Sequence, residues 1–355
     1  MSASLEGIRR RSGTVREPRV TLAHGGGGKA MHDLIEDVFL RHFTNEALAP
    51  LEDQARLDLA PLLALGDRLA LTTDSYVVTP LFFPGGDIGK LAVYGTVNDL
   101  AVGGARPLYL TCAMILEEGL EIATLRRVVE SMAAAAREAG VQIVTGDTKV
   151  VPAGACDKLF INTAGVGVID AGCRLSAASC RPGDAILVNG RLGDHGAAIL
   201  NARGDMALST PIESDCAPLH GVIALLLKAA PGTRFLRDAT RGGVATVLNE
   251  IAEASRVEIA IEEDATPIGA EVRGFCEILG LDPLYLANEG RFVAVVPEDA
   301  AAAALEALRA HPLGKGAVRI GTVLEGRAGR VVMRTGFGGH RIVDMLVGEQ
   351  LPRIC

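Results

Sequence analysis

The chain has 355 residues, a length that indicates two domains of ordinary size or one unusually large domain. Hydrophobic residues make up 49% of the chain and charged residues 22%, so a sizeable core can form and wholesale disorder is excluded. The net charge of −8 opposes binding to nucleic acid and to anionic membranes. No apolar stretch reaches the roughly 18 residues of a membrane span, and we therefore expect a cytoplasmic protein.

The first half of the chain alternates strand-like and helix-like segments. Residues 1–18 are charged and lack apolar periodicity, which predicts a mobile extension. Apolar residues spaced by three and four from Met31 to Phe39 predict one face of a helix. Further on, the patterns predict a strand at 68–73, a helix at 88–102, a strand at 108–116, a helix at 124–139, and strands at 141–145 and 159–168.

A turn signal, Cys180-Arg-Pro-Gly-Asp184, stands before a fresh strand and marks the expected boundary between two domains. The second half repeats the alternation of strands and helices, and the two halves together predict a mixed α/β fold. In order, the patterns predict a strand at 185–188, helices after Gly193 and at 219–229, a loop at 237–243 that opens a helix, strands at 257–261 and 292–296, a helix at 298–310, and strands at 318–324 and 330–334.

The glycine run His24-Gly-Gly-Gly-Gly-Lys29 opens the first predicted helix. Bare backbone N–H groups at a helix start favour anions, and Lys29 adds a positive charge, so Gly26, Gly27, Gly28 and Lys29 are candidate phosphate-binding residues. The run is not a Walker A loop, because alanines replace its first glycine and its magnesium-binding hydroxyl. A flexible hinge before a helix explains the run equally well.

Six aspartates stand at predicted element ends, and none of them belongs to a Cys/His cluster. Hard oxygen ligands of this kind suit magnesium, which one or two carboxylates and the phosphates of a nucleotide commonly hold. Each aspartate alone is more simply a helix cap or a turn residue, so only the joint pattern argues for Mg²⁺ and ATP. All of them except Asp87 are our candidate metal ligands: Asp67, Asp74, Asp99, Asp147 and Asp238.

Two further polar segments are candidates for chemistry. Lys149 directly follows Gly146-Asp147-Thr148 and would neutralise phosphate charge there, although an ordinary solvated lysine fits the sequence as well. Asp194-His195 is a candidate acid/base pair, but a surface histidine beside a helix start is the simpler interpretation.

The seven cysteines are an odd number without a C-x-x-C spacing, so we expect free thiols and no zinc site. The last of them, Cys355, ends the chain, and prenylation is excluded because that modification requires residues after the cysteine. A thiol on a mobile tail can be presented to one protein for modification and then folded back into the chain's own site. This position therefore indicates a carrier thiol.

These residues resemble the HypE family of hydrogenase expression/formation proteins, within the superfamily typified by aminoimidazole ribonucleotide synthase. The resemblance covers residues 19–355, and only the extension at 1–18 stays unexplained by it. The aspartate motifs are those of the superfamily, whereas the terminal Cys is typical of the HypE family. The motifs are His24–Lys29, Thr72–Asp87, Gly95–Gly104, Val144–Lys149, Arg237–Gly243, Asn288-Glu289-Gly290 and Pro352–Cys355.

The resemblance implies a PurM-like two-domain fold. Residues 19–178 would form an ATP-binding domain that pairs its sheet with that of a second copy into a barrel, which makes the protein a homodimer. Residues 179–342 would form an α+β domain that closes over the site, and residues 343–355 a flexible tail. The nucleotide-binding residues that the motifs imply, besides the glycine run, are Asp74, Asn98, Asp99, Gly146, Asp147 and Thr148.

The resemblance also implies a reaction. The carbamoyltransferase HypF would place a carbamoyl group on the terminal thiol, and this chain would dehydrate it with ATP to a thiocyanate. The cyanide would pass to iron on the HypC–HypD complex and become a ligand of the nickel–iron hydrogenase centre. The catalytic residues carried over from the motifs are Cys355, Lys149, Arg241 and Glu289, the last as the candidate base.

Two alternatives share parts of this pattern. Another ATP-using member of the superfamily, such as a purine-pathway cyclase, a thiamine-phosphate kinase or a selenophosphate synthetase, would carry the same aspartates but needs no terminal Cys. A non-catalytic scaffold that bears a thiol for metallocentre assembly would need the Cys but would release no ADP.

Overall fold

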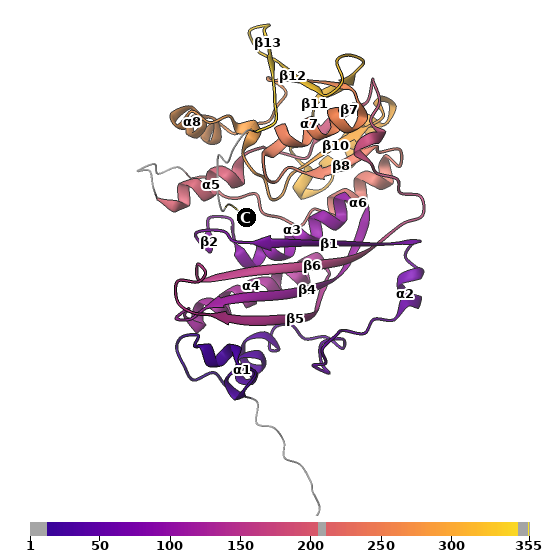
Figure 1. Cartoon of the computed structure of the whole chain (residues 1–355). Coiled ribbons are helices and arrows are strands. Elements are labelled where there is room, and N and C mark those ends of the chain that lie inside the picture. Colours follow the sequence, from indigo (N-terminus) through magenta and orange to yellow (C-terminus); the bar gives the residue numbers. More distant parts are fainter. Residues whose placement is uncertain (1–12, 205–210, 347–353, 355) are drawn as a thin grey trace, which may run out of the picture.

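The computed structural model describes residues 13–204, 211–346 and 354, and these form two units, each built on one sheet (Figure 1). The expected extension at 1–18 and the expected tail at 343–355 therefore lie largely outside the described residues. Across the described ranges, no helix is long and apolar enough to cross a membrane.

The first unit is a four-stranded sheet with the strand order β1-β6-β4-β5. Strands β4 and β5 run parallel, and the other two pairings are antiparallel. Before the sheet come the short helical segments η1 (Leu22–Gly25), α1 (Lys29–Leu34), a π-helical turn (Ile35–Phe39) and α2 (Leu59–Leu63). The sheet and its helices are β1 (Arg68–Tyr76), α3 (Ile88–Val102), β4 (Ala105–Glu117), α4 (Ile122–Ala139), β5 (Gln142–Val151) and β6 (Leu159–Ile169). A small ribbon of β2 (Phe82–Phe83) and β3 (Gly86–Asp87) precedes α3.

Helices α3 and α4 cover one face of this sheet, and the other face carries exposed apolar side chains. Asp87 caps the start of α3, because its side chain accepts hydrogen bonds from the backbone N–H groups of Gly89 and Lys90. Gly95 lets α3 approach β1, because a Cβ there would lie 2.2 Å from the hydroxyl oxygen of Tyr76. On the opposite face, Leu71 is 76% exposed.

The second unit is a seven-stranded sheet with the order β13-β12-β9-β11-β7-β10-β8, covered by helices on both faces. Helix α7 packs on one face, and α6 and α9 pack on the other. The C-terminal part of α3 joins this second packing layer, so one helix belongs to both units. The elements are β7 (Ala185–Val188), α5 (Asp194–Arg203), α6 (His220–Ala229), β8 (Phe235–Asp238), α7 (Gly243–Ser255), β9 (Glu258–Glu262), α8 (Ala270–Leu279), β10 (Phe292–Val296), α9 (Ala301–Arg309), β11 (Val318–Leu324), β12 (Arg330–Arg334) and β13 (His340–Ile342).

The mixed α/β fold predicted from the sequence is confirmed. The predicted bounds of the helix at 88–102 and of the strands at 318–324 and 330–334 agree with the structure. Helix α8, strand β13 and strand β8 were missed. The aspartates predicted at element ends are partly inside elements instead: Asp74 lies in β1, Asp99 in α3 and Asp147 in β5. The strand predicted to end at 145 continues, because Gly146 packs against the backbone of Cys112 and keeps the ladder paired. All six cysteines within the described residues are free thiols, as predicted.

Candidate active site

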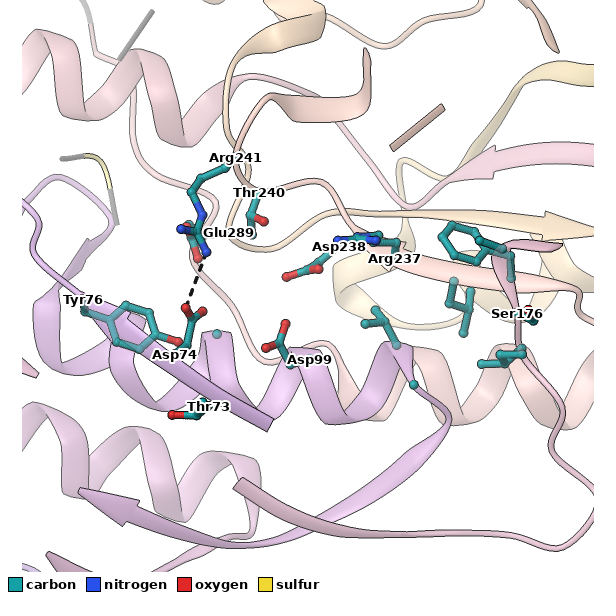
Figure 2. Close-up of a pocket in the computed structure, with 17 residues that line it drawn as sticks. Thr73, Asp74, Tyr76, Asp99, Ser176, Arg237, Asp238, Thr240, Arg241 and Glu289 are labelled. Atoms are coloured by element: carbon teal, nitrogen blue, oxygen red, sulfur yellow. Dashed lines mark ion pairs between the residues drawn. The ribbon is translucent and has the colours of Figure 1, made fainter. Parts of the chain in front are cut away.

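A cavity of about 490 Å³ lies between the two units (Figure 2). Strand β1 and helix α3 line it from the first unit, and strand β8 with the loops that follow β8 and precede β10 lines it from the second. Its wall is rich in carboxylates, with guanidinium groups among them. The charged side chains that line it are Asp74, Asp99, Arg237, Asp238, Arg241 and Glu289.

The carboxylates in this cavity disfavour one another's ionisation. Burial, followed by the charges of Asp99 and other neighbours, raises the pKa of Asp238 to about 7. Burial, with the charges of Asp238 and Asp215 next in size, raises the pKa of Glu289 well above its ordinary value. Burial also raises the pKa of Asp99, although the hydroxyl of Thr72 donates a 2.8 Å hydrogen bond to that carboxylate. The site therefore holds more negative charge than its surroundings favour.

The compensating cations sit at the mouth of the cavity. Arg241 lies 3.6 Å from the Asp74 carboxylate, and its side chain is 72% exposed (Figure 2). Arg237 forms a 2.8 Å ion pair with Glu250 on α7 and thus points partly away from the cavity. An exposed guanidinium beside a crowded carboxylate group suits the binding of a polyanion such as a nucleotide phosphate.

The residues present fit a magnesium ion that is shared with a nucleotide. Asp74, Asp99 and Asp238 supply hard oxygen donors to one cavity, and a divalent cation would relieve their mutual repulsion. Within the described residues, no three His, Cys, Asp or Glu side chains form a closed metal cluster. An ion held by one or two of these carboxylates would take its other ligands from waters and phosphate oxygens.

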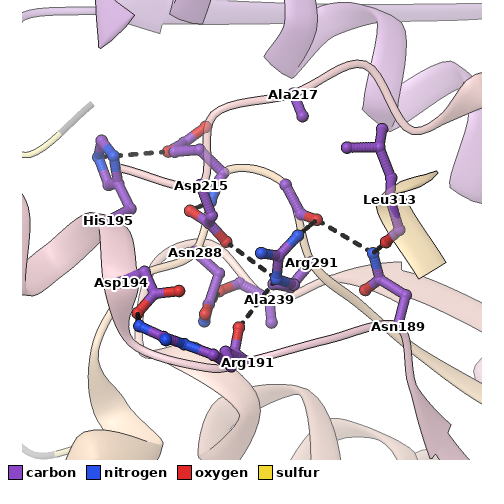
Figure 3. Close-up of polar contacts among 12 residues, drawn as sticks. Asn189, Arg191, Asp194, His195, Asp215, Ala217, Ala239, Asn288, Arg291 and Leu313 are labelled. Carbon is purple, nitrogen blue, oxygen red and sulfur yellow. Dashed lines mark hydrogen bonds and ion pairs between the residues drawn. The ribbon is translucent and has the colours of Figure 1, made fainter. Parts of the chain in front are cut away.

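Hydrogen bonds from Asn288 and to Asp215 fix the turn that carries Glu289 (Figure 3 labels Asn288 and Asp215). Asn288 accepts a 2.7 Å hydrogen bond from the backbone N–H of Gly193 and donates one to the carbonyl of Ala239. The backbone N–H of Glu289 donates to the Asp215 carboxylate over 2.9 Å. A Cβ at Gly290 would lie 1.9 Å from the carbonyl oxygen of Asp215, so this turn requires glycine there.

His195 lies beside this turn and is fully buried, contrary to the expectation of a surface residue at a helix start (Figure 3). Its Nε2 is 2.8 Å from the carbonyl oxygen of Ile354 and 4.0 Å from a carboxylate oxygen of Glu289. Its Nδ1 is 2.8 Å from the hydroxyl oxygen of Ser214. His195 is thus a core residue. It lies in the first turn of α5, which faces the first unit, where its ring contacts that of Phe83.

The chain end reaches the same place. Ile354 is 6% exposed and packs with the apolar core of the first unit. Cys355, the predicted carrier thiol, lies outside the described residues. Ile354, which precedes the terminal cysteine, is therefore docked against His195, and the same His195 nitrogen lies near the Glu289 carboxylate.

Other predicted site residues lie elsewhere. Asp147 and Lys149 are exposed on the face of the sheet that α3 and α4 leave open, and their charged groups are 3.4 Å apart. Gly146, Asp147 and Thr148 line a second cavity of about 240 Å³, together with Met31 and His32 of α1. Gly26, Gly27, Gly28 and Lys29 directly precede that part of α1, and the Lys29 ammonium pairs with Asp33 over 2.8 Å.

Asp67 and Asn98 also lie outside the linings of these two cavities, as do the glycine run, Lys29 and Lys149. Asp67 precedes β1, where its carboxylate forms a 3.1 Å ion pair with Arg68. Asn98 is buried, and its amide donates to the carbonyls of Ala217 and Glu289 and accepts from the N–H of Leu219. Asn98 therefore joins the two units through its amide group. The five predicted metal ligands thus do not form one set.

The sequence patterns also missed three residues of this region. Ser214 and Asp215 lie in a segment without periodicity that links α5 and α6, so no pattern singled them out. Tyr76 lines the cavity at the end of β1, and its hydroxyl lies 3.4 Å from that of Thr96. In the sequence, Tyr76 stood out only as a member of the Thr72–Asp87 motif. In the structure it is the last residue of β1, and its side chain is buried.

Comparison with known protein families shows the class of the chain. Residues 52–169 match the N-terminal domain of AIR synthase related proteins, and residues 181–334 match the C-terminal domain of the same group. The chain is thus an AIR synthase related protein with both domains.

Individual relatives narrow this class. The chain is 64% identical over 341 residues to carbamoyl dehydratase HypE of Rhodobacter capsulatus, which covers 96% of this chain and 99% of the relative. A solved structure of hydrogenase maturation protein HypE in complex with ATP is 55% identical, has a TM-score of 0.89, and covers 94% of this chain and 99% of its own. A HypE–HypF complex structure contains a chain 49% identical to this one, with a TM-score of 0.76 and coverage of 88% and 99%. The chain therefore belongs to the HypE family, which confirms the family predicted from the motifs.

Proposed function

We propose that this chain is an ATP-dependent carbamoyl dehydratase that converts an S-carbamoyl group on its own Cys355 into a thiocyanate. The product would supply cyanide for the iron of nickel–iron hydrogenase during maturation. Membership of the HypE family supports the reaction. The observation that carries it for this chain is the docking of Ile354 beside His195 and Glu289 in the region between the two units.

The proposed reaction removes one water from the carbamoyl group. The carbamoyl oxygen attacks the terminal phosphorus of ATP, the bond from that phosphorus to ADP breaks, and the oxygen becomes part of a phosphate leaving group. The nitrogen then loses both protons while the C–O bond breaks and the C≡N bond forms, which releases inorganic phosphate. ATP thus makes a poor leaving group into a good one.

The residues around the cavity suit these steps. Glu289 is our candidate acceptor for the nitrogen protons, because its buried carboxyl group lies 4.0 Å from Nε2 of His195, the same atom that contacts the docked chain end. Arg241 would neutralise charge on the transferring phosphoryl group from the cavity mouth. Lys149 lies on the other face of the sheet, so its proposed role requires the sheet of a second copy beside it.

A homodimer through the first unit is part of the proposal. Leu69, Leu71 and Ile115 are exposed on the open face of the sheet, at 55%, 76% and 41%. A patch of large apolar side chains on a sheet face favours pairing with a second copy. The glycine run and Gly146–Thr148 would then bind ATP next to that interface, with Mg²⁺ held by carboxylates among Asp74, Asp99 and Asp238.

We further propose HypF as the carbamoyl donor, the HypC–HypD complex as the cyanide acceptor, and the cytoplasm as the place of the reaction. The HypE–HypF complex structure supports the first of these partners.

Intact-protein mass spectrometry tests the proposal. After carbamoylation by HypF, addition of Mg-ATP should make the modified chain lose the mass of one water, and peptide mapping should place the change on Cys355. Cys355→Ala should retain ATP binding and show neither modification, whereas Cys276→Ala, a buried cysteine of α8, should behave as the wild type. Water loss that maps to another cysteine would contradict the carrier-thiol reaction.

A further inference from the structure

The buried His195 has no part in the reaction as written, and yet both of its ring nitrogens face polar partners. Its ring is 0% exposed and lies edge-on to the ring of Phe83 at a centroid distance of 5.7 Å. A fully buried imidazole with two directed contacts is held in one orientation.

The partners determine which nitrogen carries the proton. The carbonyl oxygen of Ile354 can only accept, so Nε2–H of His195 donates to it over 2.8 Å. Burial lowers the pKa of His195, which favours the neutral ring, and Nδ1 then accepts from the hydroxyl of Ser214. Ser214 in turn accepts a 3.1 Å hydrogen bond from the backbone N–H of Cys216. A chain of three hydrogen bonds thus ends on the last peptide carbonyl before Cys355.

Glu289 is the second acceptor within reach of the same N–H group. Its carboxylate oxygen is 4.0 Å from Nε2, too far for a hydrogen bond while Ile354 is docked. If the chain end leaves to be modified, the Ile354 carbonyl leaves with it. A buried N–H without an acceptor is costly, and the adjacent carboxylate would replace the lost partner after a small movement.

We propose that His195 is a positioning residue that holds the chain end in place through the Ile354 carbonyl, and that its Nε2–H turns to the Glu289 carboxylate when the chain end departs. The inference rests on the proposed function, in which the chain end must both leave and return. Return of the chain end then withdraws His195 from Glu289, so the candidate base is released from that hydrogen bond only when the substrate group has arrived.

Reactivity of the terminal thiol in the full-length protein tests this arrangement. We expect His195→Leu to increase the rate at which iodoacetamide alkylates Cys355, followed by mass spectrometry of the C-terminal peptide, by about tenfold, the factor that corresponds to about 1.4 kcal/mol. His195→Gln keeps an N–H donor near the Nε2 position and should stay within about twofold of the wild type. His220→Leu replaces the histidine that begins α6, and it should leave the alkylation rate unchanged.

A second, smaller substitution tests the same hydrogen-bond chain in case His195→Leu does not fold. Ser214→Ala keeps the imidazole but removes the hydroxyl that fixes its tautomer, and it should increase alkylation of Cys355 by about threefold. Thermal melting checks that each variant is folded. Alkylation rates in folded His195→Leu and Ser214→Ala that equal the wild-type rate would overturn the proposal.

Single-turnover dehydration separates this inference from the proposed function. With carbamoylated chain and saturating Mg-ATP, His195→Leu should slow water loss about tenfold without changing the KM for ATP, and His195→Gln should restore the rate. A wild-type chain that loses no water would refute the dehydratase reaction, while the alkylation result would still decide the role of His195. A normal rate in His195→Leu would refute the positioning role and leave the reaction intact.

Discussion

The two faces of the four-stranded sheet carry polar residues of different character. On the face towards α3, Asp74 points into a cavity shared with buried carboxylates, where burial and like charge raise the pKa of Asp238 to about 7. On the open face, Asp147 and Lys149 are exposed and paired with each other over 3.4 Å. Side chains alternate between faces along a strand, so similar aspartate motifs on β1 and β5, the two edge strands of the sheet, supply two separate environments.

This difference decides how much each residue can contribute. An exposed ion pair such as Asp147–Lys149 stabilises a fold by about 0–1 kcal/mol, since water screens it. A crowded buried carboxylate stores unfavourable energy that a proton or a metal ion can release, which is what a catalytic site needs. The cavity face is therefore where substitutions should have the largest effect on chemistry, and the open face where they should affect assembly.

The largest effect should come from Glu289→Gln on the cavity side. The amide keeps the size of the side chain but cannot accept the nitrogen protons, so single-turnover water loss should fall by about 10²- to 10⁴-fold. ATP binding, measured by calorimetry, should change little. The control is Glu298→Gln, an exposed carboxylate paired with Arg319, which should leave the rate unchanged. A Glu289→Gln chain that dehydrates at the normal rate would move the base elsewhere.

Asp238→Asn should change how stability depends on pH. Because the pKa of Asp238 is about 7 in the folded chain and near 3.8 when unfolded, the folded state binds the proton more tightly. Without metal or nucleotide, the free energy of unfolding should therefore fall as pH rises from about 4 to about 7, by at most roughly 4 kcal/mol. The substitution should flatten this slope in urea unfolding series. A slope that Asp238→Asn leaves unchanged would show that this carboxyl does not titrate there.

On the open face, Leu71→Asp should act on assembly. The charge would interrupt an apolar patch that we propose to be the dimer interface, so sedimentation should shift from about twice 37.0 kDa towards 37.0 kDa. Phe337→Asp is the matched control, because Phe337 is also exposed but lies in the turn between β12 and β13. A wild-type chain that sediments as a monomer at micromolar concentration and still turns over ATP would contradict the dimer.

The smallest effect should come from Asp67→Asn. Asp67 lines neither cavity and pairs only with the neighbouring Arg68 among the contacts described, so Mg-ATP affinity should stay within about twofold of the wild type. Asp74→Asn, measured beside it by calorimetry, should weaken Mg-ATP binding more than tenfold. Equal losses of Mg-ATP affinity in the two variants would show that Asp67 and Asp74 bind the same metal ion.

The sequence by itself determined the mixed α/β fold, the bounds of α3, β11 and β12, and the family, because these depend on local periodicity, caps and short motifs. It also singled out Asp74, Asp99, Asp238 and Glu289 as polar residues in those motifs. Only the tertiary structure decided that these four share one cavity while Asp147 and Asp67 do not, and that Asn98 joins the two units. It likewise decided that His195 is buried against Ile354. The physical reason is that a residue's face, burial and partners depend on elements more than a hundred positions away, and no local pattern carries that information.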